Sequence, residues 1–243
     1  MLDFTDIAII DTDVITPSDV ARRAGSLRTS SDASAEAFAD CGRAFMSFGL
    51  FQEAMAAYSD AIARDSNCLG GFLGRAQAGY ALILAGRDME NSRRSSEVAS
   101  DYRQALKITG GTSREAILGL GSALLAANKF AECANWIEEQ LRDREVDKNH
   151  EGDLLYLLAL CRLFAGDLDE ACNHAAKMDR VAGFEGERFF ICGLISWLKG
   201  DRGELIEYRA ALQLRDEKLA RALGAIEAGA EAGTFLELAR LLI

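Results

Sequence analysis

Proline is almost absent from this chain: Pro17 is the only one in 243 residues. Proline interrupts helices because it lacks the backbone N–H and its ring clashes with the preceding turn. Runs of Val, Ile and Thr are also scarce after residue 20, whereas Ala and Leu are abundant. Both features favour helices over strands, so the sequence predicts an all-α protein.

The chain also lacks clusters of positively charged residues. The chain has 27 Lys and Arg against 38 Asp and Glu, a net charge of −11, and its densest basic spot is the pair Arg93 and Arg94. Because nucleic-acid binding depends on clustered basic residues, we expect no nucleic-acid partner. No apolar run reaches the length of about 18 residues that marks a membrane-spanning helix, so we also expect no membrane insertion.

Signals for secretion are missing as well. The first ten residues, MLDFTDIAII, are acidic where a secretory signal is basic. The six cysteines are spread along the chain without a CxxC pair, which is typical of free thiols in a reducing compartment. The sequence therefore predicts a cytoplasmic location.

Residues that could carry chemistry are few. The two histidines, His150 and His174, fall in different segments, His150 in a predicted loop, so that a zinc site would need ligands from several segments. The cysteines show no neighbouring base, and we expect them to be buried apolar residues, except Cys68, which we expect to be exposed. The glycine-rich stretches at 69–74 and 119–122 lack the Lys-Ser/Thr ending of a phosphate-binding loop. We therefore predict no catalytic residue, no metal site and no cofactor.

What the chain does have is a recurring pair of amphipathic segments, clearest over residues 35–65. Phe38, Cys41 and Phe45 share one face at helical spacing. Gly42 leaves room for close packing, and Gly49 is suited to end the helix in the left-handed conformation. The following segment carries an inner stripe of Phe51, Ala54, Tyr58 and Ala61.

This pattern resembles the tetratricopeptide repeat, a helix–turn–helix unit of about 34 residues. Five units begin near residues 35, 69, 114, 152 and 186 and cover residues 35–215, with extra residues around 85–95 in the second. The family's proline near the end of each unit is missing; Ser66 holds that place in the first. The resemblance implies a right-handed superhelix of antiparallel helical hairpins, a TPR-like α-solenoid, and a generic array of helical hairpins is the alternative.

Both ends of the chain differ from the repeats. Residues 1–31 begin with an alternating acidic and apolar stretch that could be extended or disordered. Thr16 and Pro17 then form a favourable helix start, which predicts a short helix near 17–27, followed by a linker over residues 25–34. Residues 216–243 are predicted to form capping helices.

The resemblance implies a concave groove, lined by the first helix of each unit, that binds a peptide or a partner helix. We take the first-helix positions that point away from the second helix as the partner-binding residues: Arg43, Gln77, Tyr80, Tyr156, Leu160, Phe164, Phe190, Leu194 and Trp197. The late part of this set is apolar and aromatic. Because exposed apolar surface of this size is unusual on a monomer, we expect it to be covered by a bound amphipathic segment, by the C-terminal helices, or by the N-terminal segment of this chain or of a second copy in a homodimer.

These features predict a non-catalytic scaffold or adaptor that binds a protein or peptide. A chaperone-like module for a secreted or assembling subunit is one alternative, and a small-molecule-sensing domain or enzyme accessory is another. Family members that bind chaperone C-termini hold a carboxylate with Lys, Asn and Arg. Those places are occupied here by Ala39, Arg43, Leu73 and Gln77, so acidic C-terminal peptides are not the expected ligand.

Overall fold

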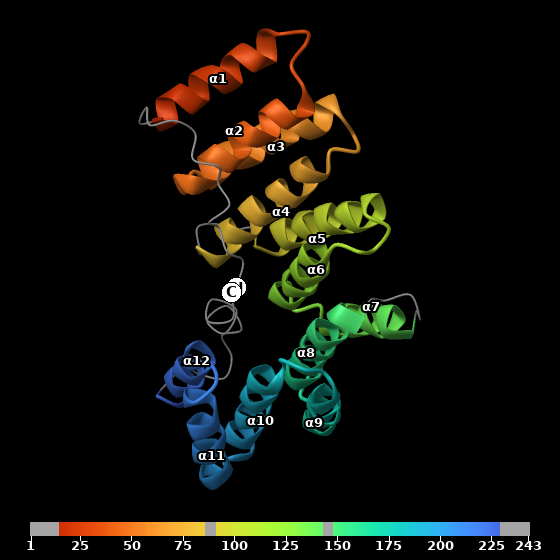
Figure 1. The fold of residues 1–243 in the computed structure, drawn as a ribbon, viewed down its shortest axis with the longest axis vertical. Helices are drawn as coiled ribbons and strands as arrows, with labels where there is room; N and C mark the ends of the chain where they lie inside the picture. Colours follow the sequence, from red (N-terminus) through yellow and green to blue (C-terminus); the bar gives the residue numbers. More distant parts are fainter. Residues whose placement is uncertain (1–14, 86–90, 143–147, 229–243) are drawn as a thin grey trace. The chain divides into compact units, whose positions relative to one another are not determined.

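The computed structural model describes residues 15–85, 91–142 and 148–228. Over these ranges the chain forms twelve α-helices and one short 3-10 helix, without a strand (Figure 1). The prediction of an all-α fold is therefore confirmed. None of the described helices combines the length and the apolar character that crossing a membrane requires.

The chain divides into two compact units, with the boundary after Met89. This boundary falls inside the second predicted helix pair, at the extra residues around 85–95. The helices that the sequence predicts over residues 35–215 are therefore divided between two compact units.

The first unit contains four helices: α1 (Pro17–Thr29), α2 (Ala35–Ser47), α3 (Phe51–Arg64) and α4 (Leu69–Leu84). Helix α2 packs against α1 and α3, and α4 packs against both α3 and α2. Helix α1 begins as the sequence indicates, because the Thr16 side chain and Asp19 form a reciprocal capping box and Pro17 occupies the first turn. It continues through residues 25–29, so that the predicted linker is reduced to residues 30–34.

A buried tyrosine and two glycines hold the helices of the first unit together. The ring of Tyr58 on α3 lies where a Cβ on Gly42 or Gly74 would stand, at 2.6 and 2.2 Å respectively. The predicted role of Gly42 in close packing is thus confirmed. Gly49 has a φ of +70°, and the N–H of the next residue, Leu50, donates to the Phe45 carbonyl at 3.0 Å, which confirms the predicted left-handed helix end.

The second unit contains eight helices that alternate along the chain: α5 (Asn91–Ile108), α6 (Arg114–Ala126), α7 (Phe130–Arg142), α8 (Lys148–Phe164), α9 (Leu168–Lys177), α10 (Glu185–Lys199), α11 (Arg202–Gln213) and α12 (Glu217–Glu227). A 3-10 turn, η1 (Met178–Arg180), follows α9. Each helix packs against its neighbour in sequence, and α6, α8, α10 and α12 also pack one on the next. Helices α6, α8 and α10 are the first helices of three successive pairs, and α12 follows the last of these pairs.

The largest difference in element boundaries concerns α8. It begins at Lys148, four residues before the predicted start of its unit at Gly152, and includes His150, which we expected in a loop. The extended stretch expected within residues 1–14 and the second capping helix expected near the C-terminus lie outside the described residues.

Candidate partner-binding face

In the first unit, the predicted partner-binding residues differ in accessibility. Arg43 on α2 is exposed, and its guanidinium pairs with Glu36 at 2.7 Å and with Asp40. Gln77 on α4 is half-buried and Tyr80 is buried. Arg43 is therefore the most accessible of these three residues, and two carboxylates already neutralise its charge.

In the second unit, three of the predicted apolar residues are interior. Leu160, Phe190 and Leu194 have exposed fractions of only 2, 0 and 2%. The cause is the packing of each first helix on the next: a Leu223 methyl of α12, for example, lies 2.6 Å from where a Cβ on Gly193 of α10 would stand. The unit's own helices, α12 among them, thus cover part of this apolar surface, and covering by the C-terminal helices was one of the alternatives expected.

Three predicted aromatic residues of the second unit remain partly exposed to solvent. Tyr156 and Phe164 on α8 and Trp197 on α10 are half-buried. The ring of Phe164 stacks on Phe130 of α7 with 6.0 Å between ring centroids. Leu198, beside Trp197, is 42% exposed. A partner-binding face in this unit therefore depends on Tyr156, Phe164 and Trp197, and not on Leu160, Phe190 and Leu194.

The second unit also contains charged residues that were not among those predicted from the sequence. Arg114 of α6 donates to both carboxylate oxygens of Asp153 on α8, from Nε at 2.5 Å and from Nη2 at 2.8 Å. The Asp153 side chain is buried, whereas Arg114 is largely exposed. This hydrogen bond raises the pKa of Arg114 although burial lowers it, and the paired geometry joins two successive first helices.

Glu187, in the first turn of α10, lies in the same neighbourhood. Its pKa is raised, first by burial, with Asp216, Asp153 and Glu185 acting in the same direction. Asp216 caps α12, its Oδ1 accepting from the Leu219 N–H at 3.0 Å. Arg114 interacts electrostatically with Glu187, although no basic side chain of the described residues lies within ion-pair distance of it. Acidic residues on α8 and at the starts of α10 and α12 therefore all act to raise the pKa of Glu187.

Tyr156, one of the residues predicted from the sequence, lies on α8 three residues after Asp153. Its hydroxyl oxygen is buried and has no hydrogen-bond partner among the described residues. Its pKa is raised by burial and, to a smaller extent, by Glu187 and Asp216. The register of the repeat would have indicated Asp153 and Glu187, because each directly follows the first residue of a predicted unit, at 152 and 186.

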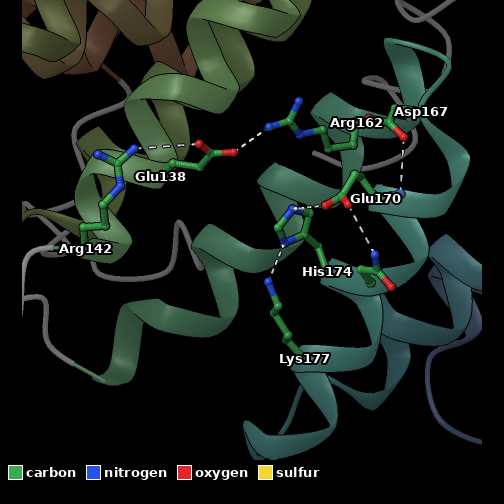
Figure 2. Close-up of polar contacts among 8 residues, drawn as sticks. Glu138, Arg142, Arg162, Asp167, Glu170, His174 and Lys177 are labelled. Atoms are coloured by element: carbon green, nitrogen blue, oxygen red, sulfur yellow. Dashed lines mark hydrogen bonds and ion pairs between the residues drawn. The ribbon is translucent and has the colours of Figure 1, made fainter.

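Two groups of polar contacts lie on α7, α8 and α9, and the group on α9 includes His174 (Figure 2). Glu138 pairs with Arg162 at 2.5 Å and with Arg142 at 3.8 Å. On α9, His174 Nε2 lies 3.6 Å from Glu170 and Nδ1 lies 3.5 Å from the Lys177 ammonium. His174 is buried, and burial lowers its pKa, with Lys177 acting in the same direction. The Glu138–Arg162 pair joins α7 to α8, whereas the contacts of His174 with Glu170 and Lys177 are with residues of its own helix.

The cysteines are free thiols. Cys41, Cys133 and Cys161 are buried as expected, but the expectations for two others are wrong. Cys68 is buried because it caps α4, its Sγ accepting from the Gly71 N–H at 3.3 Å. Cys172 is exposed on α9. Within the described ranges no group of three or more His, Cys, Asp or Glu side chains could hold a metal ion.

Comparison with known proteins gives a structural result only. No protein-family model matches the chain, and no curated protein matches it significantly. Solved structures do. PilW, described as a widely conserved type IV pilus biogenesis factor, superposes with a TM-score of 0.57 at 19% identity, over 86% of this chain and 98% of its own.

Two further structures are described as TPR proteins. YrrB, a TPR protein with an unusual peptide-binding site, superposes with a TM-score of 0.50 at 16% identity, over 86% of this chain and 100% of its own. TTC0263 of Thermus thermophilus superposes with a TM-score of 0.51 at 18% identity, over 73% of this chain and 89% of its own. The helix pairs, the glycine contacts and these likenesses together show that the chain has the fold of the tetratricopeptide-repeat proteins.

Proposed function

We propose that the protein is a non-catalytic scaffold or adaptor that binds a peptide or amphipathic helix of another protein along the face of its first helices. The observation that carries the proposal is that three aromatic side chains of α8 and α10, Tyr156, Phe164 and Trp197, are only half-buried. Aromatic residues are enriched at protein interfaces, where they supply large contact area at low entropic cost. YrrB, which has the same fold, is described as having a peptide-binding site, and this supports the proposal.

The proposal also includes a location. The six cysteines are free thiols, which is consistent with a reducing cytoplasm. The partner is a protein and not a nucleic acid, because the chain carries a net charge of −11.

Site-specific photo-crosslinking in the native cell tests the proposal. A benzophenone amino acid replaces Trp197 on α10 in one full-length variant and Asn173, an exposed residue on the second helix α9, in the other. We expect a discrete crosslinked protein from position 197 that is absent from position 173. In the unmodified background, Trp197→Ala should lower recovery of the same protein.

Equal capture from both positions, or capture unaffected by Trp197→Ala, would show that the first helices do not bind the partner. Circular dichroism of each variant checks that the helices are retained, since Trp197 also packs within its unit.

A further inference from the structure

We propose that residues 2–14 of the chain bind to an apolar edge of the first unit, at the end where α1 begins. The apolar edge consists of Ile15, Met46, Phe48, Leu50 and Phe51. Residues 2–14 lie outside the described ranges, and the described chain begins at Ile15. The inference goes beyond the proposed function, since it concerns the first unit and a segment of the chain itself.

The fold of the first unit brings the start of α1 and the turn between α2 and α3 to the same end. Helices α1 and α3 both run antiparallel to α2, because each pair packs together across a short connection. Contacts at the other end agree: Arg28 pairs with Asp60 at 2.7 Å, and Arg64 donates to the Ser30 carbonyl at 2.9 Å. Ile15, directly before α1, therefore lies at the end of the unit where α2 passes into α3 (Figure 1).

Apolar side chains are exposed at this end of the unit. Ile15 is 48% and Phe48 is 40% exposed, and they are two of the five large apolar side chains that are exposed among the described residues. Around the turn, Met46, Leu50 and Phe51 are half-buried. Single exposed apolar side chains are common on soluble proteins, whereas several gathered in one place usually mark a binding surface.

The segment that precedes Ile15 has a composition suited to cover the apolar edge. It has four aspartates, no basic residue, and the large apolar residues Leu2, Phe4, Ile7, Ile9, Ile10 and Val14. Its apolar side chains gain free energy when they leave water. Arg23, in the second turn of α1, is exposed and forms no ion pair among the described residues. This arginine offers the aspartates a complementary charge next to the edge.

The segment is also attached at the edge itself, because it continues directly from Ile15. A ligand attached by a short tether has an effective concentration on the order of millimolar, so that modest contacts are sufficient to hold it. In extended form, residues 2–14 span at most about 45 Å, whereas α1 is about 20 Å long. The segment can therefore cover the apolar edge and still reach Arg23. A separate molecule would have to displace it from this place.

Photo-crosslinking of the purified full-length protein tests the inference. A benzophenone amino acid replaces Phe48 in one variant and Ala56, an exposed residue in the middle of α3, in the matched control. After irradiation, mass spectrometry of a protease digest identifies the residues joined to the benzophenone. We expect position 48 to be joined to residues 2–14 in a product of single-chain mass, and position 56 not to be joined to them.

Substitutions in the segment separate binding from mere proximity. Phe4→Asp with Ile7→Asp places charges at two apolar positions, and the matched control, Thr5→Ala with Thr12→Ala, leaves the apolar positions intact. We expect the aspartate variant to lower the yield of the crosslink from position 48 by roughly tenfold and the control to retain it. With Phe48 in place, hydrogen peroxide should oxidise the half-buried Met46 faster in the aspartate variant than in the control.

Equal crosslink yields in the two segment variants, or equal rates of Met46 oxidation, would overturn the inference, since the segment would then lie near the edge without covering it. A product of twice the chain mass would show that a second copy covers the edge, and the inference would be wrong. It would also be wrong if position 48 gave no crosslink to residues 2–14. In each of these cases the crosslink from position 197 still reports on the proposed function independently.

Discussion

Single glycines determine how closely the helices of this protein approach, and the same arrangement occurs in both units. A tyrosine ring on a second helix covers a glycine on the next first helix: Tyr58 covers Gly74, and Tyr102 covers Gly119. In both cases a Cβ on the glycine would lie 2.2 Å from a ring carbon. Since interiors are close-packed and side chains occupy defined rotamers, the ring cannot make room without cost.

Gly74→Ala should therefore destabilise the protein, by about 1–3 kcal/mol, the usual cost of overpacking a core. The matched control is Gly25→Ala on α1, where no atom lies within 4 Å of the added Cβ. The control should stabilise the protein by up to about 1 kcal/mol because alanine is the better helix former. Urea unfolding of both variants measures these free energies. If the two substitutions have effects of the same sign, the close contact with Tyr58 does not limit the packing.

His174 makes stability depend on pH. Burial and Lys177 hold its pKa below the ordinary value, and Glu170 opposes them. Arg162 and Glu138 face it from the neighbouring helices (Figure 2). The unfolded chain therefore binds this proton more strongly than the folded chain. The contribution of His174 to stability is complete above a pH of about 6.5, the unfolded pKa, and is lost as the pH falls from there through the lowered folded pKa.

His174→Gln removes the titration while retaining a polar side chain of similar size. Between neutral pH and about pH 5.5, just below the ordinary histidine pKa, the unmodified protein should lose more of its free energy of unfolding than the variant does. Urea unfolding at a series of pH values gives both curves. Curves that remain parallel through this range would show that the burial of His174 has no effect on its proton affinity.

At the scale of the elements, the sequence predicts helix pairing well because the local signals are strong. The start of α6 at Arg114, the start of α4 at Leu69 and the left-handed end at Gly49 all agree with the register of the repeat. The start of α8 was not predictable in the same way. The register of the repeat gives only the first position that faces a neighbouring helix, although Asp147, directly before Lys148, is a residue type favoured before a helix start.

The candidate site was only partly predictable for a similar reason. Register identifies which side of a first helix a residue occupies, but not whether the next first helix covers it. Tyr156 and Trp197 therefore remain accessible, whereas Phe190 and Leu194 are interior. Asp216 lies against the start of α10, its Cβ 3.5 Å from where a Cβ on Gly186 would stand, and this depends on how α10 packs on α12, for which the sequence gives no local signal.

At the scale of the whole molecule, the chain contains two cores. The first unit buries Phe38 and Tyr58, and the second buries Leu120, Leu158 and Ile191. A unit with its own hydrophobic core can in principle fold alone. The second unit, with eight of the described helices, has the larger core of the two.

We therefore expect the fragment 90–243 to fold by itself. Far-ultraviolet circular dichroism should show a helical spectrum, and thermal unfolding should be cooperative, because the buried residues of α6, α8 and α10 come entirely from this fragment. In the full chain, Gly74→Ala should lower the unfolding temperature of the first unit and leave the transition seen in the isolated fragment unchanged. A fragment that melts without cooperativity, or a full chain in which Gly74→Ala shifts every transition equally, would mean that the second core is stable only in the presence of the first.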